Sequence, residues 1–199
     1  MSGKQLRIGG TMDRLESQSM QDSTVAQLTR AILDGSIESG TELTQVDLAN
    51  SLGISRMPVR EALFALEHRG LVTRLPNKHC RVCRPTRQQL ERVLTLCTSI
   101  ETDVLADLPA STNLPTSEMA FHAALLEACG EGYPRRVLAT TTSVYVSYLA
   151  QLQPEMAEQR ETMLAQARMH AAEGDRAQTT YDLNAYAAQL MRACPFEKE

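Results

Sequence analysis

The residues with the clearest capacity for chemistry lie between positions 55 and 92. This segment carries nine Lys or Arg residues and three Glu residues, a net charge of +6, whereas residues 93–199 carry seven cations and fourteen acids, a net charge of −7. Guanidinium groups donate paired hydrogen bonds to phosphate oxygens and to the edge of guanine. A basic segment joined to an acidic body predicts a local polyanionic partner, and the alternative is an ordinary Arg-rich surface.

Within this segment, Ser55 opens the stretch SRMPVREALFAL. Ser55 can cap a helix. Pro58 fits the first turn, because the backbone N–H that proline lacks would have no partner within the helix there. The buried face of this helix is predicted at Val59, Ala62, Leu63 and Leu66. Arg56 and Arg60 are four residues apart and therefore share one exposed face. If either arginine is considered alone, the alternative is that it lies on an ordinary solvent-exposed helix face and binds no partner.

The elements around this stretch are three short helices and a hairpin. Helical periodicity and capping residues predict helices over residues 23–35, 43–53 and 55–70. Two segments that alternate apolar and polar residues, 71–75 and 80–84, flank the turn PNKH, in which Asn77 tolerates a left-handed backbone. This order predicts a winged helix-turn-helix over residues 23–85, with Lys78 and His79 beside Asn77 at the wing tip.

From Thr86 to the C-terminus the pattern is helical throughout. Proline and glycine divide it into five predicted helices, over residues 86–108, 117–130, 133–152, 154–174 and 176–193. Residues 86–199 are therefore expected to form an antiparallel α-helical bundle for effector binding or dimerisation, and the fold class is mainly α. Residues 1–22 are polar and are predicted to be a flexible tail.

Two other residue pairs have spacings that are typical of ligands or redox groups. Glu118 and His122 are four residues apart on one helix face and could ligate one metal ion, or His122 is simply a hydrogen-bonded, partly buried side chain. Cys80 and Cys83 have a redox-like spacing, but residues i and i+3 of a strand face opposite sides. That geometry argues against a disulfide and against shared metal ligation.

Tyr145 and Tyr148 could line a polar pocket, or Tyr148 belongs to a core stripe on its helix. No nucleophile–base pair, phosphate loop or paired-carboxylate motif stands out, so we predict that the protein is not an enzyme. Five scattered cysteines fit reduced thiols in a cytoplasm, and no apolar run is long enough to predict a membrane helix or a secretory signal.

The stretch LTQVDLANSLGISRMPVREALFALEHRGLV, followed by a basic hairpin, resembles the GntR family of bacterial transcription regulators. The likeness covers residues 23–85, and its signature, SR-x-PVREAL-x-x-L-x-x-x-G-L, is matched almost literally from Ser55 to Leu71. The resemblance implies DNA contacts from Ser55, Arg56, Met57, Arg60, Asn77 and Lys78. Val46 stands where many members carry Arg or Glu, and Asn77 stands where the wing usually has Gly.

The second domain resembles the fatty-acid-responsive-like FCD subgroup of that family, in a shortened and divergent form, through AFHAALLEA and a later EGD followed by R-x-Q. In that subgroup the bundle often holds a divalent metal through an acid, the His four residues later and two further histidines, with a small carboxylate beside it. Here Glu118 and His122 match, but the later positions fall near Leu164 and Tyr186, and Cys97 replaces a common arginine. We therefore expect no metal.

Together these observations predict a cytoplasmic, sequence-specific DNA-binding transcription regulator, a repressor and homodimer acting on a palindromic double-stranded operator, with no membrane partner. A small organic acid in the bundle would modulate its affinity for DNA. The predicted effector-binding residues are Cys97, Glu118, His122, Tyr145 and Tyr148. The alternative is a bundle that is only a dimerisation or protein-interaction module; a metal-bound, hydrolase-like site on Glu118 and His122 would need further ligands.

Overall fold

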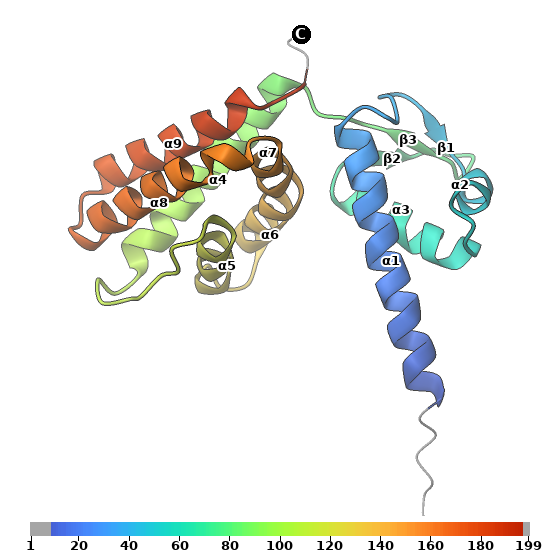
Figure 1. Ribbon diagram of the computed structural model, residues 1–199, viewed down its shortest axis with the longest axis horizontal. Helices are drawn as coiled ribbons and strands as arrows, with labels where there is room; N and C mark the ends of the chain where they lie inside the picture. The colour runs from blue at the N-terminus through green and yellow to red at the C-terminus, as the bar shows by residue number, and fades with distance from the viewer. Residues whose placement is uncertain (1–8, 197–199) are drawn as a thin grey trace, which may run out of the picture. The chain divides into compact units, whose positions relative to one another are not determined.

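A computed structural model describes residues 9–196, with side chains from residue 19 onward. The chain divides into two compact units, Met1–Arg84 and Pro85–Glu199. The predicted boundary between residues 85 and 86 lies one residue from this division. Unit 1 contains α1 (Gly9–Leu33), β1 (Glu42–Leu43), α2 (Gln45–Leu52), α3 (Arg56–His68), β2 (Val72–Arg74) and β3 (Cys80–Val82) (Figure 1).

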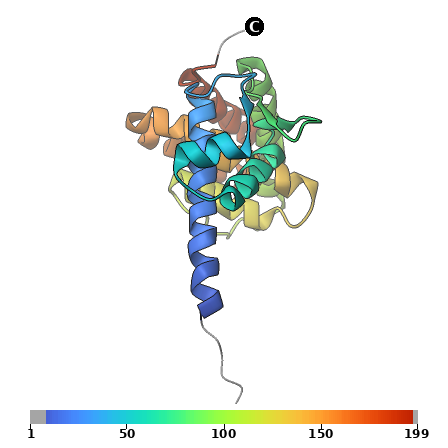
Figure 2. The ribbon, with the colours of Figure 1, turned by 90° about the vertical axis from the view of Figure 1, so that its right-hand side faces the viewer.

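Helix α1 begins at Gly9, well before the predicted start at residue 23 (Figures 1 and 2). The predicted loose tail over residues 1–22 therefore differs from the structure at residues 9–22, while residues 1–8 lie outside the described part of the chain. The physical reason is the composition of the segment after Gly10, which contains no Gly or Pro before Gly35. A helix that is packed at its C-terminal end can extend through such a segment because each added residue adds one backbone hydrogen bond.

The helix-turn-helix is made by α2 and α3. Thr44 caps α2 by accepting a hydrogen bond from the backbone N–H of Asp47, as predicted. Gly53 ends α2 with φ 65°, in the left-handed region that favours glycine. Ile54 and Ser55 then lead directly into α3, so the turn between the two helices is short and fixed.

The wing is a three-stranded antiparallel sheet in the order β1-β3-β2. The predicted hairpin is confirmed, with Thr73 opposite Arg81 in the β2–β3 register. Strand β1, in which Glu42 pairs with Arg81, was not predicted, and its second residue, Leu43, was expected to begin the helix over residues 43–53. Two residues are too few to show an alternating pattern, and β1 exists because β3 offers it hydrogen bonds.

The turn at the wing tip differs from the prediction in one residue. Lys78, not Asn77, has the left-handed backbone, with φ 66°. The Asn77 side-chain oxygen instead accepts a hydrogen bond from the His79 N–H at 3.1 Å. The Lys78 N–H donates to the Leu75 carbonyl at 3.0 Å, which makes a three-residue hairpin loop whose last position is left-handed.

The core of unit 1 lies between α1, α3 and the sheet. Its members are apolar and at most a few per cent exposed: Leu28, Ile32, Leu33, Val59, Leu63, Leu66, Leu71 and Val82. This core fixes α3 by the buried stripe that the sequence predicts, so the opposite side of α3 faces away from the core.

Unit 2 is helical throughout its described residues. Its elements are α4 (Arg87–Asp107), α5 (Glu118–Ala128), α6 (Tyr133–Thr141), a π-helical turn (Thr142–Val146), α7 (Ser147–Leu152), a 3₁₀ turn (Pro154–Met156), α8 (Ala157–Ala172) and α9 (Arg176–Arg192). Helices α8 and α9 lie side by side with α4 packed across them (Figure 1). The mainly α fold, with a helix-turn-helix unit followed by a helical bundle, is confirmed.

The predicted helix over residues 133–152 is divided by the π-helical turn. Thr86 and Gln89 form a reciprocal capping box at the start of α4, whereas Ser55 occupies the N-cap position of α3 without a side-chain capping hydrogen bond. Within the described residues no helix has the length and apolar character that crossing a membrane requires.

Candidate functional site

The start of α3 presents polar groups that its own helix does not use. Ser55 has the extended backbone of an N-cap, but its hydroxyl makes no capping hydrogen bond. The first amide groups of a helix carry partial positive charge and lack partners within the helix. Arg56 and Met57 follow immediately and are exposed. This end of α3 can therefore bind an anionic group from outside.

Arg60 lies one turn further along the same exposed side of α3. Its Nε and Nη2 atoms donate to Oε1 of Glu61, at 3.1 and 2.8 Å. The two side chains are 55% and 39% exposed, so water competes for both. Exposed ion pairs contribute about 0–1 kcal/mol. Arg60 can consequently leave Glu61 for a stronger acceptor at little cost.

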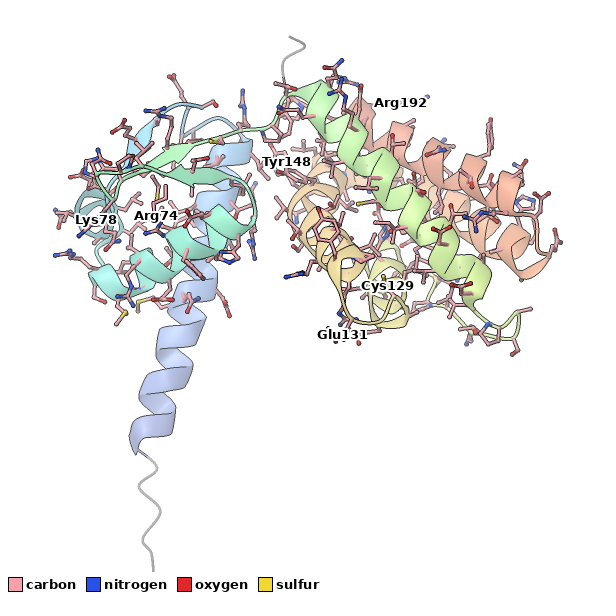
Figure 3. The ribbon with its side chains drawn as sticks, turned by 180° about the vertical axis from the view of Figure 1, so that it is seen from behind. Arg74, Lys78, Cys129, Glu131, Tyr148 and Arg192 are labelled. Carbon is pink, nitrogen blue, oxygen red and sulfur yellow. The ribbon has the colours of Figure 1, made fainter. Side chains whose placement is uncertain are left out.

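The wing supplies a second cationic group on the same unit. Lys78 lies in the turn at the tip of the β2–β3 hairpin (Figure 3). Behind it, Glu42 on β1 lies 3.3 Å from Arg81 Nη2 and 3.5 Å from His79 Nδ1. Hydrogen bonds from Arg81 and then His79 lower the pKa of Glu42. Arg81 and His79 are thus engaged with Glu42, whereas Lys78 occupies the left-handed position of the turn.

The structure thereby places four of the predicted contact residues, Ser55, Arg56, Met57 and Arg60, together at one end of α3. The other two, Asn77 and Lys78, share the wing turn. The Asn77 side-chain oxygen accepts a hydrogen bond from the His79 N–H, and its amide nitrogen lies 3.2 Å from His79 Nδ1, so both ends of this side chain contact His79 within the turn.

Unit 2 contains a buried polar network centred on His122. The His122 Nδ1 atom lies 2.7 Å from Glu101 Oε1, and its Nε2 atom lies 2.8 Å from the Tyr186 hydroxyl. Tyr186 donates in turn to Glu118 Oε1 at 2.8 Å. Burial alone lowers the pKa of His122, but the carboxylates of Glu101 and Glu118 outweigh burial and raise it.

Arg160 completes this network from α8. Its Nε and Nη2 atoms donate to the two carboxylate oxygens of Glu118 at 2.8 and 3.1 Å. The remaining guanidinium hydrogens reach the backbone carbonyls of Gln153 at 3.0 Å and Ala150 at 3.3 Å. Arg160 is 1% exposed, so this ion pair is shielded from water. The paired, fork-shaped contact satisfies both charged groups.

This network bears on the metal hypothesis. Both ring nitrogens of His122 and both carboxylate oxygens of Glu118 already have protein partners. Arg160 provides the positive charge that a divalent ion would otherwise bring to Glu118. Among the residues that the structure describes, no group of three or more His, Cys, Asp or Glu residues is arranged to hold a metal ion.

The other predicted effector residues lie in different surroundings. Cys97 is buried beside Thr141, and burial raises the pKa of its thiol to about 11, which makes it an unreactive core group. Tyr145 lies in the π-helical turn, where burial raises its pKa. Tyr148 stacks on Phe196 with ring centroids 6.4 Å apart. Of the five predicted effector residues, Glu118 and His122 belong to one network, because both form hydrogen bonds with the Tyr186 hydroxyl.

Sequence reasoning missed Glu101, Arg160 and Tyr186 as members of this network. A signal was available, because each is a polar residue on an otherwise apolar helix stripe. Glu101 lies between Leu94 and Leu105 on the buried side of α4. Periodicity can show that such a residue is buried, but it cannot show which partners on other helices meet it.

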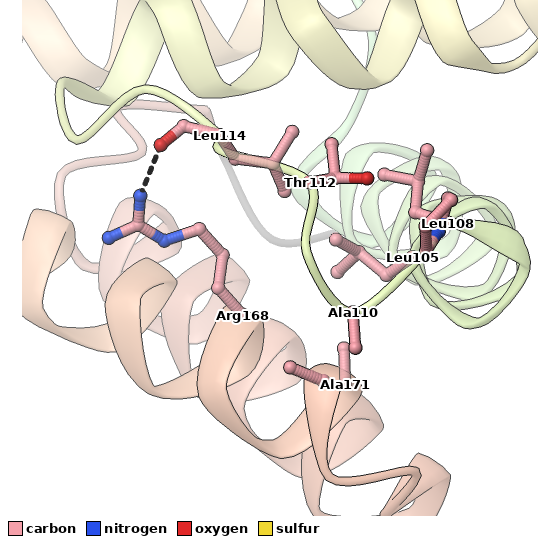
Figure 4. Close-up of a pocket in the computed structure, with 9 residues that line it drawn as sticks. Leu105, Leu108, Ala110, Thr112, Leu114, Arg168 and Ala171 are labelled. Atoms are coloured by element: carbon pink, nitrogen blue, oxygen red, sulfur yellow. Dashed lines mark hydrogen bonds between the residues drawn. The ribbon is translucent and has the colours of Figure 1, made fainter.

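A small cavity lies where the α4–α5 loop covers α8 (Figure 4). Arg168 Nη1 donates to the carbonyl oxygens of Leu114 and Pro115, both at 2.8 Å, and so clamps the loop onto the helix. The cavity has a volume of about 40 Å³. That is room for about one water molecule, and it is far below the size of a pocket for an organic ligand.

Residues 20–82 match the family model described as bacterial regulatory proteins, gntR family. The chain is also 40% identical over 53 residues to an uncharacterized HTH-type transcriptional regulator of Mycobacterium tuberculosis strain H37Rv, a match that covers 27% of this chain and 22% of that protein. The match to the gntR family model therefore concerns residues 20–82, which lie within unit 1.

The alignment spans about a fifth of the length of the mycobacterial relative. A second relative, an uncharacterized HTH-type transcriptional regulator from an intergenic region of Agrobacterium vitis, is 27% identical over 89 residues, which cover 45% of this chain and 52% of that protein.

One solved structure shares the fold over most of the chain. It is described as "Lar controls the expression of the Listeria monocytogenes agr system and mediates virulence", and it has a TM-score of 0.59 with 15% sequence identity. The alignment covers 87% of this chain and 95% of that one. At this identity the likeness concerns the fold alone.

Proposed function

We propose that this protein is a sequence-specific DNA-binding transcription regulator and that α3 is its recognition helix. The observation that carries the proposal is the start of α3, where an unused Ser55 hydroxyl, Arg56 and Arg60 share an exposed end of a helix that its core packing holds rigidly. Recognition helices insert this end into the major groove, and guanidinium groups there bind guanine or phosphate. Lys78 would hold a neighbouring phosphate from the wing.

The simplest assembly for such a regulator is a cytoplasmic homodimer on a palindromic operator. Two-fold symmetry would place two copies of α3 about one helical turn of DNA apart. A dimer bound across a promoter would exclude the polymerase, and repression is therefore the proposed outcome.

The direct test is selection of DNA duplexes from a random pool, followed by binding measurements with Arg60→Ala. If Arg60 forks onto a base pair, its removal should weaken binding to the selected duplex by about 1–3 kcal/mol and relax the preference at one position. Arg136→Ala, which removes an exposed arginine from unit 2, is the matched control and should leave binding unchanged. Recovery of no sequence, or equal binding by Arg60→Ala, would overturn the assignment.

For unit 2 we propose assembly rather than effector sensing. The observation favouring assembly is the saturation of Glu118 and His122 by Arg160, Glu101 and Tyr186, since an organic acid or a metal at this place must first break the buried ion pair. A ligand that binds the folded protein raises its melting temperature. We therefore expect no thermal shift with small carboxylates or divalent metals, and light scattering should show a dimer. A chelator-sensitive shift would restore the effector hypothesis.

A further inference from the structure

The exposed side of α3 carries an apolar strip as well as cations. Met57 is 55% exposed and Phe64 is 52% exposed. The two are seven residues apart, which is close to two helical turns, so both lie on the side of α3 opposite the buried stripe. Two large apolar side chains on the solvent-facing side of one helix are exposed at a free-energy cost unless a partner covers them.

The groups around the strip indicate the chemistry of that partner. Arg60 lies between Met57 and Phe64 in the sequence and on the adjoining part of the same exposed side, and Arg56 lies beside Met57. An apolar partner surface without negative charge would leave these guanidinium groups poorly solvated. A polyanion with apolar groups exposed in a groove would satisfy both features, and the thymine C5-methyl is the apolar group that the major groove presents.

The Phe64 ring is held in position before any partner binds. Its centroid lies 4.3 Å from that of His68, with the planes at 52°. His68 is itself held by a hydrogen bond of 3.0 Å between its Nδ1 atom and the Phe64 carbonyl oxygen. An aromatic side chain fixed in this way loses little rotamer freedom when a methyl group packs against it.

The spacing of the two side chains agrees with the spacing of bases. Seven residues of α-helix rise about 10 Å, and stacked bases are about 3.4 Å apart along a strand. Met57 and Phe64 would therefore meet groups about three base steps apart if α3 lies along the groove, with Arg60 between them at a guanine or phosphate.

We propose that Met57 and Phe64 are specificity-determining residues that select thymine by packing against C5-methyl groups in the major groove. This inference rests on the proposed DNA-binding function and adds an apolar base contact to it. Phe64 lies outside the set of contacts that the family resemblance implies, so it is a feature of this chain rather than of the motif.

The test uses a duplex selected for binding to the full-length protein and a second duplex in which deoxyuridine replaces thymine. This exchange removes methyl groups and leaves every hydrogen-bonding group in place. We expect binding to weaken about fourfold for each methyl group that is buried, from the transfer free energy of one such group. Phe64→Ala should weaken binding to the thymine duplex by a similar factor and abolish discrimination at one of the two positions.

Phe64→Leu keeps an apolar side chain and should retain part of the discrimination, and Met57→Ala should abolish it at the other position. Leu96→Ala, which shortens an exposed apolar residue of unit 2, is the matched control. Equal binding of both duplexes by the wild-type protein overturns this inference and leaves the proposed function standing. Absence of any selectable DNA overturns the proposed function itself. A change in oligomeric state on Phe64→Ala, with unchanged DNA binding, would assign the strip to a protein contact and also overturn the inference.

Discussion

Both units carry exposed ion pairs, but the buried Arg–Glu pair among the described side chains belongs to unit 2. In unit 1 the ion pairs are exposed, as in Arg60 with Glu61 and Arg81 with Glu42, and both partners remain in contact with water. In unit 2 the Arg160–Glu118 pair is buried, and hydrogen bonds satisfy its remaining atoms. Exposed pairs exchange partners at little cost, whereas buried pairs resist separation. The first arrangement suits a surface that must bind an outside anion, and the second suits a unit that must keep one shape.

The largest expected effect on stability comes from removing one member of the buried ion pair. Arg160→Met leaves the Glu118 carboxylate buried without its cation, which should destabilise unit 2 by about 3–5 kcal/mol. Amide hydrogen exchange of α5 and α8 would follow unit 2 separately from unit 1. The double variant Glu118→Gln with Arg160→Met removes both charges and should recover much of the loss. Equal destabilisation by the single and double variants would contradict the role assigned to the ion pair.

A smaller effect is expected from pH, with opposite signs in the two units. His122 has a pKa raised above its usual value of 6.5, so its stabilisation is complete below pH 6.5 and is lost as pH rises through the folded-state pKa. Glu42 has a lowered pKa, so its contribution is present above pH 4.5 and is lost as pH falls through the folded-state value. Unit 2 should weaken on the alkaline side and unit 1 on the acid side.

Hydrogen exchange measured from pH 5 to pH 9 would show the alkaline weakening of unit 2. His122→Asn cannot gain a proton in this range, so it should lack that dependence. A wild-type unit 2 whose stability is unchanged across this range would show that Glu101 does not stabilise a protonated His122.

The smallest expected effect on stability comes from substituting Lys78 at the wing tip. Two substitutions there should affect the stability of unit 1 and its affinity for DNA differently. Lys78 has a left-handed backbone, which costs a non-glycine residue roughly 1 kcal/mol. Lys78→Gly should relieve part of that cost and raise the melting temperature of unit 1 while weakening DNA binding. Lys78→Ala keeps the strain and should weaken DNA binding without stabilisation.

The salt dependence of binding reports the charge at this position. Loss of one phosphate contact should reduce the slope of log affinity against log salt by about one for both Lys78 variants. If either variant binds DNA with an unchanged slope, Lys78 does not contact a phosphate.

The parts of the fold that follow from local chemistry could be predicted from the sequence. Thr44, Gly53 and Thr86 act on backbone groups within a few residues, so the helix ends that they set were visible in the sequence. Features that depend on distant partners were not. Strand β1 requires β3, and the left-handed position of the wing turn moved to Lys78 because Asn77 bonds to His79 instead.

The same distinction applies to the candidate sites. The exposed residues at the start of α3 could be predicted because helical spacing alone decides which side chains share a face. The network around His122 could not, since its members come from α4, α5, α8 and α9, and their meeting depends on how four helices pack. Met57 was identified through its motif, whereas Phe64 lies outside that motif and was missed, although helical spacing places it on the same side of α3 as Met57.

The π-helical turn at Thr142–Val146 has a consequence for comparing sequences. A turn of this kind contains one more residue than the corresponding stretch of α-helix. A relative with an uninterrupted helix here would therefore align only if a one-residue gap were opened in the middle of a helix, where gaps are usually penalised. Alignments without that gap would displace α7 and every later position of unit 2 by one residue, pairing the buried Leu149 with a neighbour of its true counterpart.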